Sequence, residues 1–160
     1  MRIAIAITIT VATLFVAACG SSDNTIEVGS DNSDDLPLGA GPYPIADLSF
    51  DIDLAGDGVT TRYRLACLGD TATFTGDSQD LDATAACLAL RDDDVRLRLS
   101  FNQTDAASRA CTEQYGGPEM AVISGTLDGE PVDTAIDRIN GCGIADWVLL
   151  SELLPQPSGS

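Results

Sequence analysis

The amino-acid sequence predicts an α+β domain: an antiparallel sheet of about five strands, two helices packed on it, and two disulfides. Three observations favour this class. Apolar and polar residues alternate on both sides of two Gly-containing turns, which is typical of β-hairpins with one face in water. Two further segments repeat apolar residues at helical spacing, and four cysteines are spread over the same region.

The composition excludes several classes of function. The chain has 160 residues, enough for one domain of ordinary size. Its eight basic residues are all arginine and stand against 25 acidic ones, for a net charge of -17, which argues against nucleic acid as a partner. Because the chain has no histidine, Ser/His/Asp and Cys/His catalysis are excluded. We therefore expect no enzyme activity and no cofactor.

The first 18 residues predict a lipoprotein signal peptide. Arg2 gives a positive start, and the apolar run over residues 3–18 is shorter than the roughly 20 residues that a transmembrane helix needs. The sequence VAAC at residues 16–19, followed by glycine, resembles the lipobox of bacterial lipoproteins. That resemblance implies an exported protein whose lipidated Cys19 anchors it to the outer face of the cell membrane. A plain signal peptide with an incidental cysteine is the alternative.

The rest of the chain divides into three segments. Residues 19–45 contain the lipidated N-terminus and predict a flexible acidic linker, because Ser, Asp, Asn, Gly and Pro dominate and few large apolar side chains are present. The domain itself is expected over residues 46–155. Residues 156–160 are expected to form a disordered tail.

The first predicted hairpin joins residues 48–54 to residues 59–67 through the turn Gly56-Asp57-Gly58. Its apolar face is expected at Leu48, Phe50, Ile52 and Leu54 and, on the return, at Val59, Thr61, Tyr63, Leu65 and Cys67. We expect Asp51 and Asp53 to lie opposite the arginines of the second strand, as solvated strand residues rather than as a carboxylate site.

The middle of the chain predicts a helix and then a strand. Residues 80–91 carry Ala and Leu at helical spacing, with Ser78 or Asp80 as the expected N-cap. Residues 95–101 alternate between apolar and polar, which indicates a strand. The acids at residues 92–94 lack the spacing of an EF-hand calcium loop, so we expect a solvated turn there.

The C-terminal part predicts a second hairpin and a second helix. Residues 121–127 and 132–136 alternate on either side of an Asp128-Gly129 turn. Residues 144–154 place apolar side chains at helical spacing until a proline stops the helix. Trp147 in this helix is expected to anchor the core.

Cysteine counting supports the export signal. Five cysteines are an odd number, and lipidation of Cys19 leaves four. Outside the cytoplasm these four indicate two disulfides, for which three pairings exist, and we favour Cys67–Cys87 and Cys111–Cys142. Zinc is the competing interpretation. Because no two cysteines have a two-residue spacing and the chain has no histidine, we expect no metal site.

The segment from Ala110 to Pro118, ACTEQYGGP, predicts a loop that is covalently fixed at one end. Polar residues, two glycines and a proline are incompatible with a buried strand or helix. A disulfide at Cys111 would fix the start of this loop. An exposed, tethered, polar loop is typical of a segment that contacts a partner or connects two elements.

The order of these elements and cysteines resembles the Streptomyces subtilisin inhibitor-like family, from about Asp47 to Pro155. A strand ends in YRLAC, a helix carries the second cysteine, the third opens a loop with a tyrosine four residues later, and SGTLDGEPVDTAIDRINGC leads to the fourth. The closing GCGIADW is similar to the end of many members. The resemblance implies that the first cysteine pairs with the second and the third with the fourth. It also implies a homodimer that forms through the sheet.

Members of that family inhibit serine proteases with a substrate-like loop that begins at the third cysteine. The resemblance places the reactive loop at Thr112, Glu113, Gln114 and Tyr115, with the scissile bond between Glu113 and Gln114. A loop held in its bound conformation avoids the ordering cost of a flexible substrate. The expected partner is a subtilisin-like or Glu-specific serine protease. Glu113 favours the latter, because an unpaired carboxylate in an apolar pocket costs several kcal/mol.

The alternative is a non-inhibitory lipoprotein of the cell surface that has the same fold and a binding or structural role. The loop distinguishes the two hypotheses. An inhibitor needs it extended, exposed and resistant to cleavage, whereas a binding module can hold it flat against the sheet.

Overall fold

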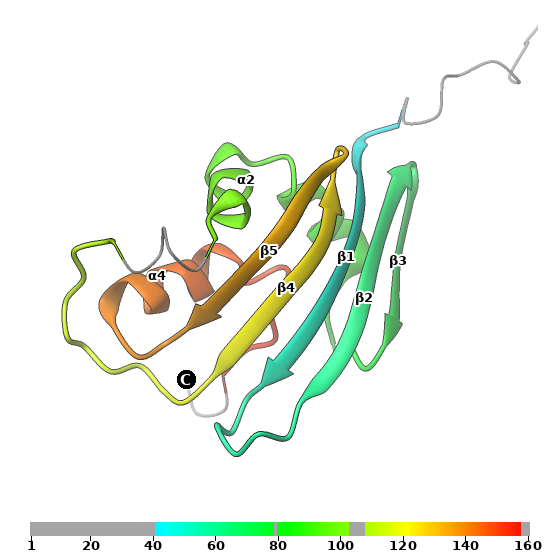
Figure 1. The fold of residues 1–160 in the computed structure, drawn as a ribbon. Coiled ribbons are helices and arrows are strands. Elements are labelled where there is room, and N and C mark those ends of the chain that lie inside the picture. The colour runs from blue at the N-terminus through cyan, green and yellow to red at the C-terminus, as the bar shows by residue number, and fades with distance from the viewer. Residues whose placement is uncertain (1–40, 79, 103–107, 158–160) are drawn as a thin grey trace, which may run out of the picture. The chain divides into compact units, whose positions relative to one another are not determined.

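The computed structural model describes residues 41–78, 80–102 and 108–157. They fold around a five-stranded antiparallel sheet with the order β3-β2-β1-β4-β5, which confirms the predicted α+β class. The strands are β1 (Tyr43–Asp53), β2 (Thr61–Gly69), β3 (Thr71–Gly76), β4 (Met120–Leu127) and β5 (Glu130–Asp137). The helices are α1 (Ala83–Ala89), α2 (Asp93–Ser100) and α4 (Gly141–Leu149). Figure 1 shows them on one side of the sheet.

The hydrophobic core lies on the face of the sheet that the helices cover. The β1–β2 ladder sets Leu48 opposite Leu65 and Phe50 opposite Tyr63, and all four side chains are buried, as the alternation predicts. The rings of Phe50 and Tyr63 stack with their centroids 4.7 Å apart. The Tyr63 hydroxyl donates a hydrogen bond of 2.7 Å to the carbonyl oxygen of Leu153. Burial raises the pKa of Tyr63 well above its usual value, so this hydroxyl stays a donor.

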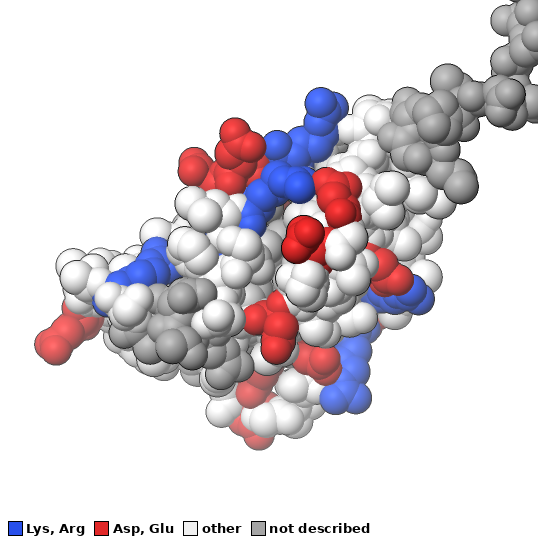
Figure 2. Space-filling model, turned by 45° about the horizontal axis from the view of Figure 1, so that its top comes forward, with Lys and Arg blue, Asp and Glu red and all other residues white. Residues whose placement is uncertain are grey.

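The opposite face of the sheet carries exposed ion pairs between neighbouring strands. Arg62 binds Asp51, and Arg64 binds Asp47. The hydrogen bond from Arg64 lowers the pKa of Asp47. Arginine and acidic side chains also lie next to each other on the face that Figure 2 shows. Asp53 differs from the prediction, because its carboxylate accepts three backbone N–H groups of the turn that follows β1.

One strand that the sequence analysis did not predict is β3, which lies at one edge of the sheet. It follows β2 directly and pairs with it antiparallel, so that Phe74 lies opposite Leu65. Its sequence, TATFTG, is short and rich in threonine. Only Ala72 and Phe74 pack against the core, which leaves a weak period-two signal.

The prediction of a strand at residues 95–101 was wrong, because this segment forms most of α2. The Asp92 carboxylate accepts two N–H groups of the first turn and caps the helix. Val95 and Leu99 are buried, whereas Leu97 between them is 56% exposed, which is the helical period. The acids at residues 92–94, which were predicted to form a solvated turn, therefore lie at the N-terminus of α2. Their negative charges interact favourably with the helix dipole there.

Both predicted helices are present, with shifted ends. The N-cap of α1 is Asp82 rather than Ser78 or Asp80, and its carboxylate accepts an N–H group at 3.0 Å. Asn140 caps α4. This helix begins three residues before the predicted start and ends five residues before the predicted end. Trp147 is 2% exposed, so it packs in the core as predicted.

Both favoured disulfides are present. Cys67–Cys87 joins β2 to α1 with a Cα–Cα distance of 5.8 Å. Cys111–Cys142 joins the loop before β4 to the first turn of α4 with a Cα–Cα distance of 5.3 Å. Two such bridges fit a protein that is located outside the cytoplasm.

The N-terminal assignments are only partly covered by the structure. β1 begins at Tyr43, three residues before the predicted start of the domain. The signal peptide, Cys19 and most of the predicted linker lie outside the described residues. Across residues 41–78, 80–102 and 108–157, every helix is too short or too polar to cross a membrane.

Candidate functional site

The segment between Cys111 and Pro118 is an exposed loop that leads into β4. The predicted reactive-loop residues all have exposed side chains and lie outside helices and strands: Thr112, Glu113, Gln114 and Tyr115. Tyr115 is 67% exposed. In Figure 1 this loop passes beside the turn that joins β5 to α4. The structure therefore brings the four predicted residues together on one accessible segment.

The N-terminal side of the loop is fixed to the start of α4 by two contacts. The first is the Cys111–Cys142 disulfide. The second is a hydrogen bond of 3.0 Å from the N–H group of Gly141 to the carbonyl oxygen of Thr112. Asn140 holds this end of α4 in place, because its side chain accepts the N–H group of Gly143 at 3.0 Å.

The C-terminal side of the loop is fixed to the turn after β5. The N–H group of Gly116 donates a hydrogen bond of 2.7 Å to the carbonyl oxygen of Arg138. A Cβ atom on Gly116 would lie 2.5 Å from Cγ1 of Ile144, so a larger residue here would have to displace the Ile144 side chain or the loop. Residues 113–115 thus span the gap between two anchored positions.

A buried ion pair lies under the C-terminal side of the loop. Arg138 Nη1 is 3.1 Å from Glu119 Oε1, and the two side chains are 15% and 4% exposed. A Cβ atom on Gly117 would collide with the Glu119 carboxylate, so glycine lets the loop backbone cross directly above it. Sequence reasoning missed this pair. Glu119 directly precedes β4 and Arg138 directly follows β5, and neither interrupts an apolar run.

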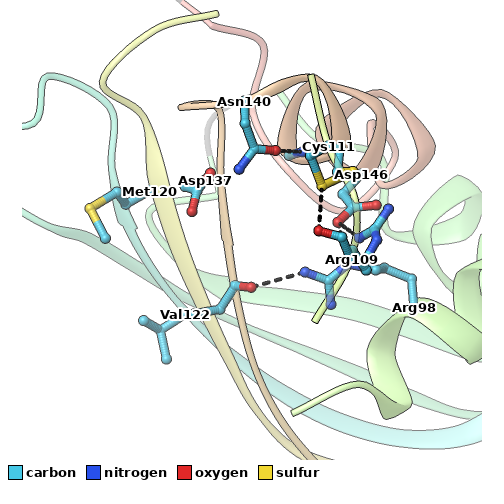
Figure 3. Close-up of a pocket in the computed structure, with 11 residues that line it drawn as sticks. Arg98, Arg109, Cys111, Met120, Val122, Asp137, Asn140 and Asp146 are labelled. Carbon is cyan, nitrogen blue, oxygen red and sulfur yellow. Dashed lines mark hydrogen bonds and ion pairs between the residues drawn. A yellow bond between two sulfur atoms is a disulfide. The ribbon is translucent and has the colours of Figure 1, made fainter. Parts of the chain in front are cut away.

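A second ion-pair cluster lies beside the disulfide at the N-terminal side of the loop. A cavity of about 400 Å³ is bordered there by Cys111, Cys142, Arg98, Arg109 and Asp146 (Figure 3). Arg98 Nε and Arg109 Nη1 each lie 2.6 Å from the same Asp146 oxygen. Arg98 also donates to β5, so it connects α2, α4 and the sheet. The hydrogen bond to Asp146 raises the pKa of Arg109.

Sequence reasoning missed this cluster as well, although one signal exists. Asp146 is the one charged residue of α4, and it is 6% exposed. An acid in an otherwise apolar helix indicates a buried partner. The identity of that partner is not readable, because Arg98 is 48 residues away and was predicted to lie on a strand.

Chemically, the site offers a peptide segment in a fixed conformation. Among the described residues, no three His, Cys, Asp or Glu side chains are grouped to hold a metal ion. No family model, curated protein or solved structure matches this chain. Its function must therefore be inferred from the loop and its anchors.

Proposed function

We propose that this protein is a substrate-like inhibitor of serine proteases, whose reactive loop is the exposed segment Thr112–Tyr115. The observation that carries the proposal is the pair of anchors on either side of the Glu113–Gln114 bond. Cys111 is held by the disulfide and Thr112 by the Gly141 hydrogen bond, and Gly116 is held by Arg138. A protease can reach the loop, and the loop does not have to be ordered on binding.

The anchors also supply a reason for slow net cleavage. After hydrolysis of the Glu113–Gln114 bond, the new carboxylate would lie one residue from the anchored Thr112. The new amine would lie two residues from the anchored Gly116. Both ends therefore stay close together, at a high effective concentration, and the peptide bond can form again in the protease active site.

The side chain at the scissile bond defines the target class. Glu113 is exposed and carries the charge that enters the primary specificity pocket of the protease. Transfer of that carboxylate into an apolar pocket without a partner is unfavourable by several kcal/mol. A pocket with a basic group pairs with it instead. The proposed target is therefore a Glu-specific serine protease.

The proposed setting is the outer face of the cell membrane. The lipobox-like sequence that ends at Cys19 supports a lipid anchor, and residues 20–42, which precede β1, are long and acidic enough to hold the domain away from an anionic membrane surface. Mass spectrometry of the membrane fraction tests this setting. A diacylglycerol adduct on Cys19 is expected, and an unmodified Cys19 would contradict it.

The experiment that tests inhibition is a titration of the oxidised chain, beginning at Gly20, against a Glu-specific serine protease and against subtilisin. Residual protease activity and cleavage of the loop are followed together. We expect stoichiometric inhibition of the Glu-specific enzyme. Glu113→Arg should abolish it, whereas Glu130→Arg, the same charge change at an exposed position of β5, should not.

Two outcomes would contradict the proposal. One is rapid cleavage of the loop without inhibition, which would make the chain a substrate. The other is the absence of both cleavage and inhibition, which would favour a binding or structural lipoprotein with the same fold.

A further inference from the structure

The two edge strands of the sheet differ in how they are protected against pairing with a further strand. β5 contains three acids and a proline, and the carbonyl oxygen of Ala135 accepts a hydrogen bond of 2.9 Å from Arg98. Charges, proline and covering side chains are the features by which natural edge strands avoid pairing with another chain. β3 has the sequence TATFTG, with no charge and no proline, and it is the outermost strand on its side of Figure 1. The β3 edge is therefore open to a partner strand.

The backbone of β3 directs every second residue's N–H and C=O groups away from the sheet. At the end of the strand the Asp77 N–H group donates a hydrogen bond of 3.0 Å to the carbonyl oxygen of Arg62. Hydrogen-bonded pairs alternate along an antiparallel ladder, so Thr75 and Thr73 are the next residues that bond to β2. The residues between them, whose backbone groups face outward, are Ala72, Phe74 and Gly76. Among the described residues, no strand pairs with them on that side.

This edge is complementary to a second copy of itself. When two β3 strands are set antiparallel with Phe74 opposite Phe74, Ala72 of each copy lies opposite Gly76 of the other. In this register every outward-facing residue of both strands has a partner for its N–H and C=O groups. The flanking residues are small, so no side chain of β3 obstructs the approach of the two backbones.

The side chains of β3 also match in this register. Phe74 is half-buried at the margin of the core, where its ring meets that of Tyr63 edge to face with the centroids 5.6 Å apart. The part of the ring that remains in solvent would meet Phe74 of the second copy. On the exposed face of the sheet, Thr73 would lie opposite Thr75 of the second copy. Aromatic pairs and threonine pairs are favourable neighbours across two strands.

The distribution of charge favours this edge as the contact between two copies. The chain has a net charge of -17, so two copies repel each other across most of their surfaces. Residues 71–76 carry no charge. The acids that flank β3 are Asp70 and Asp77, and in this register Asp77 lies opposite Thr71 of the second copy. No two carboxylates therefore face each other directly.

We propose that two copies of this chain associate through their β3 edges and form one continuous antiparallel sheet. A packing of the two sheets face to face would instead bury the exposed Arg62–Asp51 and Arg64–Asp47 pairs, which is costly. The strand order places β3 farthest from β5, so the loop of each copy remains accessible in this dimer. The inference does not depend on the proposed inhibition. Because the contact is short, the dimer should form reversibly.

The test is sedimentation equilibrium of the oxidised chain that begins at Gly20, at concentrations up to about 1 mM. The parent should show a reversible monomer–dimer equilibrium. Ala72→Pro removes an outward N–H group and places the proline ring at the contact, without loss of a hydrogen bond to β2. We expect it to raise the dissociation constant of the dimer at least about tenfold. Asp133→Pro is the matched control, because Asp133 has the orientation of Ala135 in the other edge strand. It should leave the constant within about twofold.

Amide hydrogen exchange of the parent keeps the test decisive if Ala72→Pro disturbs the fold of the edge. The Phe74 N–H group should exchange more slowly as the protein concentration rises, because the second copy then accepts its hydrogen bond. The Asp133 N–H group, at the other edge, should exchange at the same rate at every concentration. A chain that stays monomeric throughout would contradict the proposal. So would a dimer in which exchange at Phe74 does not slow, and that result would indicate association through the exposed face of the sheet.

Discussion

The two disulfides of this protein have the same chemistry and different surroundings. Cys67 and Cys87 are 2% and 0% exposed and join a strand to a helix inside the core. Cys111 and Cys142 are half-buried beside a cavity and join a loop to a helix. The first bridge connects elements that packing already holds together. The second fixes a segment whose exposed side chains contribute little packing of their own.

In the core, burial of the side chains positions the residues. In the loop, the disulfide and the backbone hydrogen bonds must do so. The four exposed side chains of the loop bury too little apolar area to order it. Its conformation depends on one bridge, two backbone hydrogen bonds and two closely packed glycines. Stability and loop geometry should therefore respond to different substitutions.

Removal of the core bridge should cause a large loss of stability. Replacement of both Cys67 and Cys87 by Ala should lower the free energy of unfolding by about 3–5 kcal/mol, because the bridge restricts a 20-residue span in the unfolded chain. Urea unfolding measures this change. The folded fraction should keep its inhibition constant toward a Glu-specific protease, since the loop is anchored elsewhere. A tenfold weaker inhibition would show that the two regions are coupled.

Removal of Arg98 should have the next largest effect and tests what fixes α4, the helix that carries the loop bridge. Arg98→Met leaves the buried Asp146 with Arg109 as its remaining ion-pair partner, and we expect a loss of about 3 kcal/mol in thermal or urea unfolding. The double variant Arg98→Met/Asp146→Leu should recover part of this loss, because it removes the buried carboxylate, and Arg109, which loses its partner, is 31% exposed and stays hydrated. A single variant as stable as the parent would contradict the role assigned to this pair.

Gly116→Ala should have a smaller effect on stability and a direct effect on the loop. The added Cβ atom meets the Ile144 side chain at 2.5 Å, so the loop, α4 or the Ile144 side chain must move. We expect a loss of about 2 kcal/mol and faster cleavage of the loop by the target protease. Melting temperature and mass spectrometry of the cleavage products measure the two effects. If neither changes, the contact with α4 does not position the loop.

The smallest effect is expected in the β1–β2 turn, which contains no cysteine of either bridge. Hydrogen bonds from backbone N–H groups, led by that of Gly58, lower the pKa of Asp53 in the folded protein. Because the folded-state pKa is below the unfolded one, this carboxylate stabilises the fold above about pH 4, and the effect disappears as the pH falls through the folded-state pKa. The difference in melting temperature between the parent and Asp53→Ala should shrink accordingly. A difference that stays constant as the pH falls below about 4 would contradict this assignment.

The sequence predicted the parts of the fold that repeat a simple pattern. Both central hairpins alternate cleanly because one face is buried and the other is in water. Residues 93–100 were ambiguous, since apolar residues at 95, 97 and 99 fit a strand as well as part of a helix. The cap at Asp92 and the burial of Arg98 against Asp146 stabilise the helix instead of a strand. β3 was missed because an edge strand buries too few side chains to give a pattern.

The candidate site was also predictable only in part. The composition of the loop and its cysteine predicted an exposed, tethered segment, which the structure confirms for Thr112–Tyr115. The supports below it were not predictable. The Arg138–Glu119 pair and the contact of Gly116 with Ile144 join residues that meet only after β4 and β5 have paired.

The proposed function depends on the loop bridge, which would hold the two ends of the Glu113–Gln114 bond together after cleavage. The most direct test starts from oxidised chain that has been cleaved at this bond and incubates it with a catalytic amount of Glu-specific protease. We expect intact chain to reappear to a measurable equilibrium fraction. Cys111→Ser/Cys142→Ser chain, cleaved at the same bond, should give none. Cleaved chain that stays cleaved, or that is degraded further while the bridge is intact, would contradict the claim.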